Sequence, residues 1–400
     1  MRAPSAPGLE VPQALYVHIP FCQRRCPYCD FAVHVGGVAR FHEYVAAVRA
    51  ELRWLAAGAA PPAPLDSVYL GGGTPSRLPA RLIAGILSTA RARFGLAPGA
   101  EVTLEANPSD VTRRRAAAWA TAGVTRVSLG VQSLDDDVLR QLGRSHTAAR
   151  ALAALRALRQ AGIPAVSCDL LYGIPGRPAG SFQASLAGLI EAEPDHVSCY
   201  ELTPERGTRL HRQVMDGLVR PPHPVANLAQ HWWAVERLEA SGYHQYEVSN
   251  FARPGQESRH NLQYWRGAGY WAAGSGAHGH LPVAVARRLA GDAPATGVGL
   301  GARAVRCWNH RGTARYLRAV AETGSGWAGW EAVDAGQAEL ERVACGLRLR
   351  EGVRLRTPAQ RRMARQLSRH GLLEVAAGRA RTTRRGEELL EAVTLRLLAA

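Results

Sequence analysis

The first half of the chain repeats one pattern of hydrophobic and polar positions, in which a short β-branched run is followed by a turn and a longer run with helical spacing. The short runs predict strands at 14–21, 65–70, 101–106, 126–131, 164–170 and 196–202. The longer runs predict helices at 40–57, 79–94, 110–122, 147–161 and 180–192. Strands that alternate with helices pair in parallel through right-handed crossovers, so the pattern indicates either a doubly wound sheet or a TIM-like barrel.

Residues able to carry chemistry stand at the carboxyl ends of the predicted strands and decide between these architectures. In chain order they are a cysteine loop, Gly71-Gly72-Gly73-Thr74-Pro75, Glu105, Gln132, Asp169 and Thr203. Barrel enzymes build their sites at this rim, and here six successive strands contribute to one mouth. We therefore predict an α/β fold with a partial (β/α)6 TIM-like barrel over residues 14–205.

The alternation breaks beyond residue 205. A helical pair at 207–217 and 225–240 precedes a strand-like run at 244–252, the segment His260-Asn-Leu-Gln-Tyr264-Trp265, a glycine-rich stretch at 267–279 and a Gly/Ala-rich connection at 286–304. The tail, 335–400, has the helices, turn and extended segments of a small α+β, winged-helix-like module. We predict four parts: a flexible N-terminus (1–13), the barrel (14–205), an extension (206–305) and the winged-helix-like domain (306–400).

Composition narrows the class of protein. A chain of 400 residues with 46% hydrophobic residues can bury one large core and a smaller one. The sequence has no secretory apolar run and no transmembrane-length apolar stretch, so we expect a cytoplasmic protein. The formal charge of +16 comes from arginines spread over the whole length, with no lysine, which indicates a codon bias rather than a nucleic-acid surface.

Three of the seven cysteines, Cys22, Cys26 and Cys29, are crowded in C-x3-C-x2-C spacing, which lets one loop wrap three thiolates around a face of a [4Fe–4S] cubane. Such clusters usually take four cysteines, so one iron is left open here. That iron can bind the amino and carboxylate groups of S-adenosylmethionine, whose one-electron cleavage gives a 5′-deoxyadenosyl radical. The alternative is structural zinc with His34 or Cys168 as fourth ligand, although zinc ribbons pair two knuckles and this chain has one.

The glycine-rich turn and the polar residues at the other strand ends suit the same ligand. Backbone groups of the GGGTP turn can reach an aminoacyl moiety with no side chain in the way. Glu105, Gln132, Arg144 and Asp169 offer hydrogen bonds to a ribose and a carboxylate, and Arg144 can pair bidentately. A structural salt bridge or cap accounts for each of these four equally well when it is taken alone.

The motifs together resemble a known family. Residues 16–31 around the cysteines, with GGGTP, LEANP, SLGVQS, DLLYGIPG and YELTPERGT, look like the radical SAM family of oxygen-independent coproporphyrinogen III oxidase, the HemN-like proteins. Residues 246–255 followed by His260-Asn-Leu-Gln-Tyr264-Trp265 are similar to its haem chaperone branch, the HemW proteins. The match runs from about residue 14 to residue 280.

The resemblance implies roles residue by residue. Cys22, Cys26 and Cys29 would ligate the cluster. As a separate hypothesis from the residue types, His260 ligates haem iron while Tyr264 and Trp265 stack on the macrocycle, although a histidine beside two aromatics is most often an ordinary core cluster. The residues implied to contact S-adenosylmethionine are Tyr16, Tyr28, Gly72, Gly73, Thr74, Glu105, Gln132, Arg144, Asp169 and Thr203.

The resemblance favours a haem chaperone that binds haem, a [4Fe–4S] cluster and S-adenosylmethionine and delivers haem to apo-haemoproteins, respiratory-chain enzymes among them. The alternative is a coproporphyrinogen III oxidase. Against it, the oxidase has a further cysteine where this chain has Phe31, and a long extension where only 21 residues precede Cys22. Arginines near the mouth could pair with haem propionates. We expect no nucleic acid partner, and membrane contact only through the recipient proteins. A homodimer is compatible with this prediction. The sequence leaves open whether S-adenosylmethionine is cleaved or only bound.

Overall fold

One curved sheet organises most of the protein in the computed structural model, which describes residues 11–58, 63–290 and 301–399. Six neighbouring strands of this sheet run parallel in chain order, as predicted. They are β1 (Ala14–Ile19), β4 (Leu65–Gly72), β5 (Leu96–Ala106), β6 (Arg126–Gln132), β7 (Ala165–Tyr172) and β8 (His196–Glu201). The predicted α/β partial-barrel fold is therefore confirmed. The predicted flexible N-terminus lies outside the described residues up to position 10.

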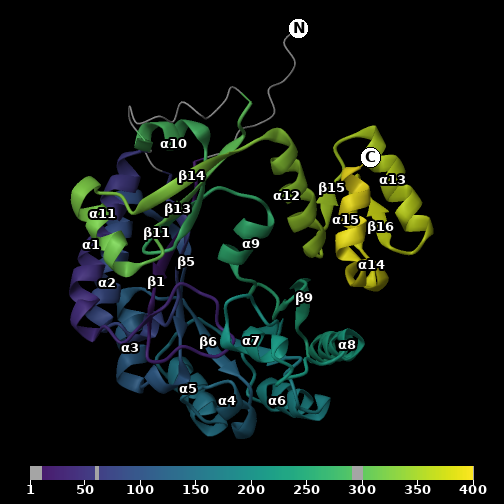
Figure 1. The fold of residues 1–400 in the computed structure, drawn as a ribbon, viewed down its shortest axis with the longest axis horizontal. Helices are drawn as coiled ribbons and strands as arrows, with labels where there is room; N and C mark the ends of the chain where they lie inside the picture. The colour runs from purple at the N-terminus through teal and green to yellow at the C-terminus, as the bar shows by residue number, and fades with distance from the viewer. Residues whose placement is uncertain (1–10, 59–62, 291–300, 400) are drawn as a thin grey trace.

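Helices cover the outer face of the parallel strands and cross from each strand to the next (Figure 1). They are α1 (Phe41–Ala57), α2 (Ala80–Phe94), α3 (Arg113–Ala122), α5 (Ala148–Gln160) and α6 (Ala179–Glu191), all close to the predicted ranges. Thr112 and Thr147 cap α3 and α5 by accepting a backbone N–H three residues on, which sets where these helices begin. The short α4 (Asp136–Gln141), capped by Asp135, was not predicted.

The sheet continues beyond the barrel strands on both sides. Beside β8 lie β10 (Asn250–Ala252) and β9 (His244–Glu247), which split the predicted strand-like run. Beside β1 lies β11 (Tyr270–Ala273), followed by the antiparallel strands β12 (His278–Leu281), β13 (Ala304–Asn309) and β14 (Trp327–Val333). Within the described residues the sheet thus has 12 strands.

Two predictions for the second half need correction or completion. Residues 286–304 were predicted to be a connection, but the first of them belong to a helix, α10 (Val283–Ala290). This helix forms because Val285 and Ala286 are buried against the core. Residues 291–300 lie outside the described residues. The predicted boundary at 306 falls within β13, a strand of the main sheet. The remaining helices before the C-terminal module are α7 (Arg209–Met215), α8 (Pro224–Ala240), α9 (Arg259–Trp265) and α11 (Thr313–Thr323).

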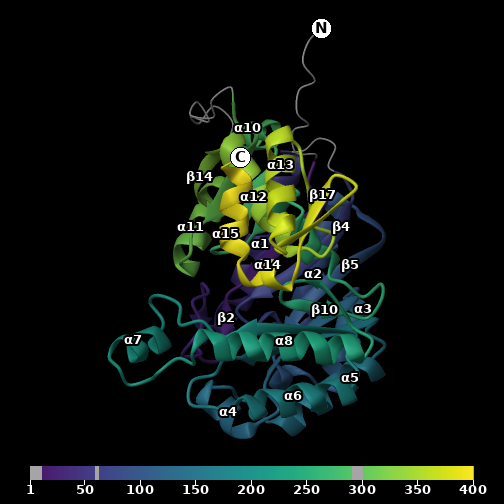
Figure 2. The ribbon, with the colours of Figure 1, turned by 90° about the vertical axis from the view of Figure 1, so that its right-hand side faces the viewer.

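A separate hydrophobic core lies in the C-terminal module, to one side of the sheet (Figures 1 and 2). Its elements are α12 (Ala335–Arg348), β15 (Val353–Arg354), α13 (Pro358–Arg369), β16 (Leu373–Ala376), β17 (Arg379–Thr382), α14 (Arg384–Glu388) and α15 (Leu390–Leu398). Capping boxes at Asp334 and Thr357 start α12 and α13. The Glu387 carboxylate on α14 accepts hydrogen bonds from His231 on α8 and Gln245 on β9, and these bonds join the module to the rest of the protein.

Candidate functional site

The carboxyl ends of the parallel strands, here called the mouth, open into a cavity of about 460 Å³ inside the barrel. Alternate residues of each strand face inward, and this period of two aligns the polar positions of β6, β7 and β8 on the wall of the cavity. These inward residues are Arg126, Ser128, Gly130 and Gln132 on β6, Ser167 and Asp169 on β7, and His196, Ser198 and Tyr200 on β8. A cavity of this size suits a small-molecule ligand.

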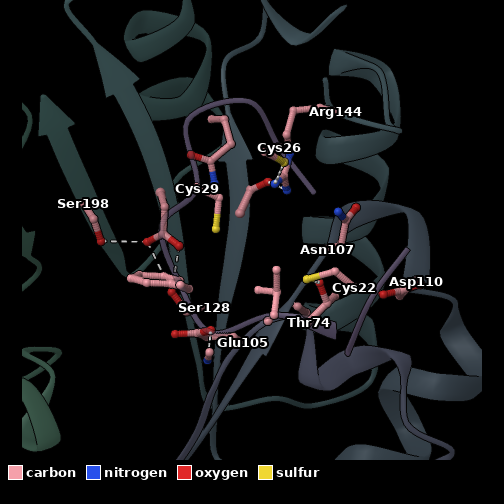
Figure 3. A pocket seen from close by; sticks show the side chains of 18 of the residues that line it. Cys22, Cys26, Cys29, Thr74, Glu105, Asn107, Asp110, Ser128, Arg144 and Ser198 are labelled. Carbon is pink, nitrogen blue, oxygen red and sulfur yellow. Dashed lines mark hydrogen bonds between the residues drawn. The ribbon is translucent and has the colours of Figure 1, made fainter. Parts of the chain in front are cut away.

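The three cysteines surround one side of the mouth and carry free thiols (Figure 3). Cys22 ends the two-residue strand β2 (Phe21–Cys22), and its Sγ lies 3.5 Å from Thr74 Oγ1. Cys26 Sγ lies 3.9 Å from Arg144 Nη1. Cys29 N–H donates to the Cys26 carbonyl at 3.2 Å, which closes a turn between the last two cysteines, and burial raises the pKa of Cys29 to about 11.

The glycine turn after β4 passes close beneath this loop. A Cβ on Gly73 would lie 2.6 Å from the backbone of Pro20, and one on Gly72 would lie 2.3 Å from the His18 ring. Gly72 also adopts a φ of 110°, a conformation that side chains disfavour. Only glycine therefore allows this turn to pack against the end of β1, which leads into the cysteine loop, and both glycines line the cavity together with Thr74.

Three carboxyl groups line the cavity, and two of them, Glu105 and Asp169, belong to the parallel strands. Glu105 accepts hydrogen bonds from Tyr69 Oη and Gly72 N–H, both at 2.9 Å, and burial raises its pKa to about 7. Asp169 accepts hydrogen bonds from Ser198 Oγ at 2.8 Å and Ser128 Oγ at 3.0 Å, and burial raises its pKa as well. Each carboxyl group is thus held in place from one side and can accept further hydrogen bonds from a ligand.

Gln132 and Arg144 complete the wall of the mouth. Gln132 has a φ of 67°, a left-handed conformation that costs a non-glycine residue energy and is found most often at functional sites. Arg144 donates from Nη2 to the Gly130 carbonyl at 2.9 Å. Its Nε and the Nη1 of Arg77 are buried with no hydrogen-bond partner among residues 11–58, 63–290 and 301–399. These unused donors fit an anionic group in the cavity.

The structure does not bring every predicted site residue to the cavity wall. Tyr28 lines it, between two cysteines. Tyr16 does not: its hydroxyl is 3.0 Å from His18 Nδ1 and its ring stacks on Tyr69. Thr203 is exposed at the rim, outside the lining residues. The assignments of Tyr16 and Thr203 to S-adenosylmethionine therefore stay predictions from the resemblance.

His260, Tyr264 and Trp265 lie on α9 at the amino ends of the strands, here called the base, away from the cysteines. His260 is fully buried, and its ring nitrogens lie 2.8 Å from Ser67 Oγ and 2.8 Å from Tyr264 Oη. Burial lowers the pKa of His260 to about 3. Trp265 packs under the guanidinium of Arg348. Both ring nitrogens of His260 are occupied, so this conformation does not support it as a haem ligand.

Comparisons with known proteins agree on one family. The model of the Radical SAM superfamily matches residues 16–187. Heme chaperone HemW from Mycobacterium tuberculosis (strain ATCC 25618 / H37Rv) is 38% identical over 400 residues, which cover 98% of this chain and 96% of that protein. HemW from Haemophilus influenzae is 36% identical over 279 residues, covering 68% of this chain and 70% of that protein. This chain belongs to the HemW family of radical SAM proteins.

A solved structure supports the fold of this HemW family member. Coproporphyrinogen III oxidase (HemN) from Escherichia coli superposes with a TM-score of 0.77 at 21% sequence identity, covering 97% of this chain and 90% of that one. At this identity the similarity concerns the fold alone.

Several polar residues of the cavity were not predicted from the sequence. Ser128 and Ser198 orient Asp169. Asn107, Ser109 and Asp110 also line the wall, and Asn107 and Asp110 lie near Cys22 (Figure 3). The signal for the two serines was the period-two alternation that leads to Gln132 and Asp169. Serines occur in strands for many structural reasons, so only the three-dimensional pairing with Asp169 shows the role of these two.

The described residues contain no cluster of three or more His, Cys, Asp or Glu side chains able to hold a single metal ion. A four-iron cubane does not require such convergence, because each thiolate binds a different iron. In the same part of the chain, no helix is long and apolar enough to cross a membrane.

Proposed function

We propose that this protein is a haem chaperone that holds a [4Fe–4S] cluster and S-adenosylmethionine at the mouth and delivers haem to apo-haemoproteins. The observation that carries the proposal is the arrangement of Cys22, Cys26 and Cys29 around one cavity with unused arginine donors. Its relatives are named as haem chaperones over nearly the whole chain length.

The residues of the cavity fit these two groups by their chemistry. Three free thiols on one loop can each bind one iron of the cluster and leave the fourth iron open. Gly72 and Gly73 offer close backbone approach, and Glu105 and Asp169 can accept hydrogen bonds from ammonium or hydroxyl groups. When bound, the cluster and S-adenosylmethionine supply one-electron cleavage of a carbon–sulfur bond.

Tyr28, Thr74, Gln132 and Arg144 would surround the same ligand. Arg144 can neutralise a carboxylate with its unused Nε while its Nη2 stays bonded to Gly130. Its contact with Cys26 also places positive charge beside the negatively charged thiolates of the cluster. Arg144 thus positions the ligand against the cysteine loop.

The partners of the protein form a further part of the proposal. Haem is the cargo, and apo-haemoproteins such as respiratory-chain enzymes are the recipients. A cytoplasmic location, peripheral membrane contact through recipients and a homodimer stay predictions.

The proposal is tested by anaerobic reconstitution of the full chain followed by titration with haemin, with and without S-adenosylmethionine. We expect haem binding, and transfer of that haem to an apo-cytochrome faster than from free haemin. Free haemin must be run in parallel, because apo-cytochromes also take up haem unaided. Absence of haem binding by the reconstituted protein would refute the chaperone function.

Coproporphyrinogen III oxidase activity is the second candidate, favoured by the shared fold. Phe31, at the mouth and 56% exposed, stands against it because the resemblance places a further cysteine there in the oxidase. Reconstituted protein supplied with reductant, S-adenosylmethionine and coproporphyrinogen III should form no protoporphyrinogen. Steady formation of that product would establish the oxidase instead.

A further inference from the structure

The segment between β8 and α8, residues 203–223 and here called the α7 segment, exposes large apolar side chains. Met215 and Leu218 are 72% and 74% exposed, and Val225, at the start of α8, is also exposed. In Figure 2 the segment projects from the body of the protein on the side of β2. Apolar side chains gathered on a projecting segment mark a binding surface more often than isolated ones do.

The α7 segment is attached to the cysteine loop. Leu210 N–H donates to the Pro27 carbonyl at 2.8 Å, between two of the cysteines. Leu210 and Val219 also share one hydrophobic cluster with Tyr28, which lines the cavity. A ligand on the outer side of α7 would therefore be held by a segment that is itself attached to the loop proposed to hold the cluster.

The outer side of α7 carries groups that bind iron porphyrins. His211 is half-buried, and its ring has no hydrogen bond or ring contact with the residues that the structure describes. Met215 follows one turn later, so the two side chains lie on the same side of the helix. Neutral imidazole and thioether are both axial ligands of haem iron in proteins.

The segment also has an excess of positive charge. Four exposed arginines form no ion pair with any described residue, and only two acidic residues accompany them. The arginines are Arg206, Arg209, Arg212 and Arg220, and the acids are Glu205 and Asp216. Haem matches this combination of side chains, because its macrocycle is flat and apolar, its iron accepts imidazole, and its two propionates can pair with arginines.

We propose that the α7 segment is the haem-docking surface, with His211 as axial ligand, Met215 and Leu218 against the macrocycle, and Arg212 and Arg220 paired with the propionates. This proposal rests on the proposed chaperone function and adds the place of the cargo. It replaces His260, whose ring is enclosed at the base, with a histidine whose ring is free at the mouth.

The test is a haemin titration of the reconstituted full chain and its His211→Ala variant, followed by the Soret band. We expect the variant to bind haemin about tenfold more weakly and with a shifted Soret band, because it loses the iron ligand. His370→Ala is the matched control: His370 is an exposed histidine in the C-terminal module, and its removal should leave both readouts unchanged. Arg212→Gln with Arg220→Gln should weaken binding about threefold and reduce its salt dependence.

The outcomes separate the two proposals. If the wild type binds no haemin, the chaperone function itself fails. If the wild type binds haemin and His211→Ala keeps its affinity and Soret band, the docking surface is refuted while the function stands. If variants of Met215 and Leu218 slow haem transfer to an apo-cytochrome without altering haemin affinity, the surface docks a protein partner and the haem proposal is likewise refuted.

Discussion

The two ends of the barrel are built from the same strands but differ in how their polar groups are used. At the base, the Glu101 carboxylate accepts hydrogen bonds from Arg126 Nε at 3.0 Å and His260 N–H at 3.0 Å, and also from Ser258 and Arg259. At the mouth, Arg77 and Arg144 hold buried donors with no partner in the described residues, and Gln132 adopts a strained conformation.

This difference indicates that the base serves stability and the mouth serves binding. The Glu101 carboxylate accepts four hydrogen bonds and so fixes one arrangement of the chain at the base, although Nη1 of its partner Arg126 is also buried without a partner in the described residues. At the mouth, the unused donors of Arg77 and Arg144 and the strained Gln132 lie around one cavity beside the cysteine loop, and features of this kind cluster at functional sites. Substitutions at the base should therefore lower the free energy of unfolding, and substitutions at the mouth should change ligand binding with little effect on folding.

Cys26→Ser should have the largest effect at the mouth. The thiolate is a cluster ligand in the proposed function, and its loop lies at the surface, so the variant should lose most of its iron and sulfide while its far-UV circular dichroism stays unchanged. Cys345→Ser, on α12 far from the loop, is the control and should keep the cluster. Wild-type protein that contains one zinc and no iron after anaerobic preparation would contradict the cluster assignment.

Arg126→Ala tests the base. Removing one partner of the buried pair leaves the Glu101 charge uncompensated, and this should lower the free energy of unfolding by about 3–5 kcal/mol. Urea unfolding measures the change. The matched control is Arg381→Ala, which breaks an exposed pair with Glu374 and should cost at most about 1 kcal/mol. Equal losses in both variants would show that the base contributes no special stability.

Much of this contrast could be predicted from the sequence, and part of it could not. The six strands and the grouping of Glu105, Gln132 and Asp169 follow from regular alternation, since parallel strands bring their carboxyl ends together. No local pattern tells at which end of the barrel a later helix packs, so the position of His260 was available only from the structure. The strands β11 and β12 were missed because they are four residues long and embedded among glycines.

Glu105 should make stability depend on pH at the mouth. Burial raises its folded-state pKa from 4.5 to about 7, so the folded protein holds this proton more tightly than the unfolded chain. Stability is therefore lost as the pH rises through this window, by on the order of 2–3 kcal/mol. Urea unfolding of ligand-free wild type and Glu105→Gln should show that the variant lacks this part of the decline. The pKa of Glu51 is also raised to about 7, but Glu51 is present in both proteins, so its contribution to the pH dependence cancels in the difference between them.

S-adenosylmethionine binding should show the opposite trend with pH. The ionised Glu105 accepts hydrogen bonds more strongly than the protonated acid, so affinity should increase as the pH rises through about 7. Glu105→Gln should bind with an affinity that does not change across that range. A wild-type affinity that falls over the same range would contradict a role for the ionised carboxylate.

Ser198→Ala should have the smallest effect and separates orientation from folding at the mouth. The substitution removes one of two hydroxyl donors to Asp169, which costs about 1 kcal/mol of the interaction. Because the second donor, Ser128, and the strand pairing of β8 remain, the loss should appear mainly in S-adenosylmethionine affinity, measured by calorimetry. Ser167→Ala, which removes a hydroxyl bonded to His196 nearer the base, is the matched control and should instead lower the free energy of unfolding. If both serine variants changed S-adenosylmethionine affinity and the free energy of unfolding alike, residues on the inner wall of the barrel would not differ in function between the mouth and the base.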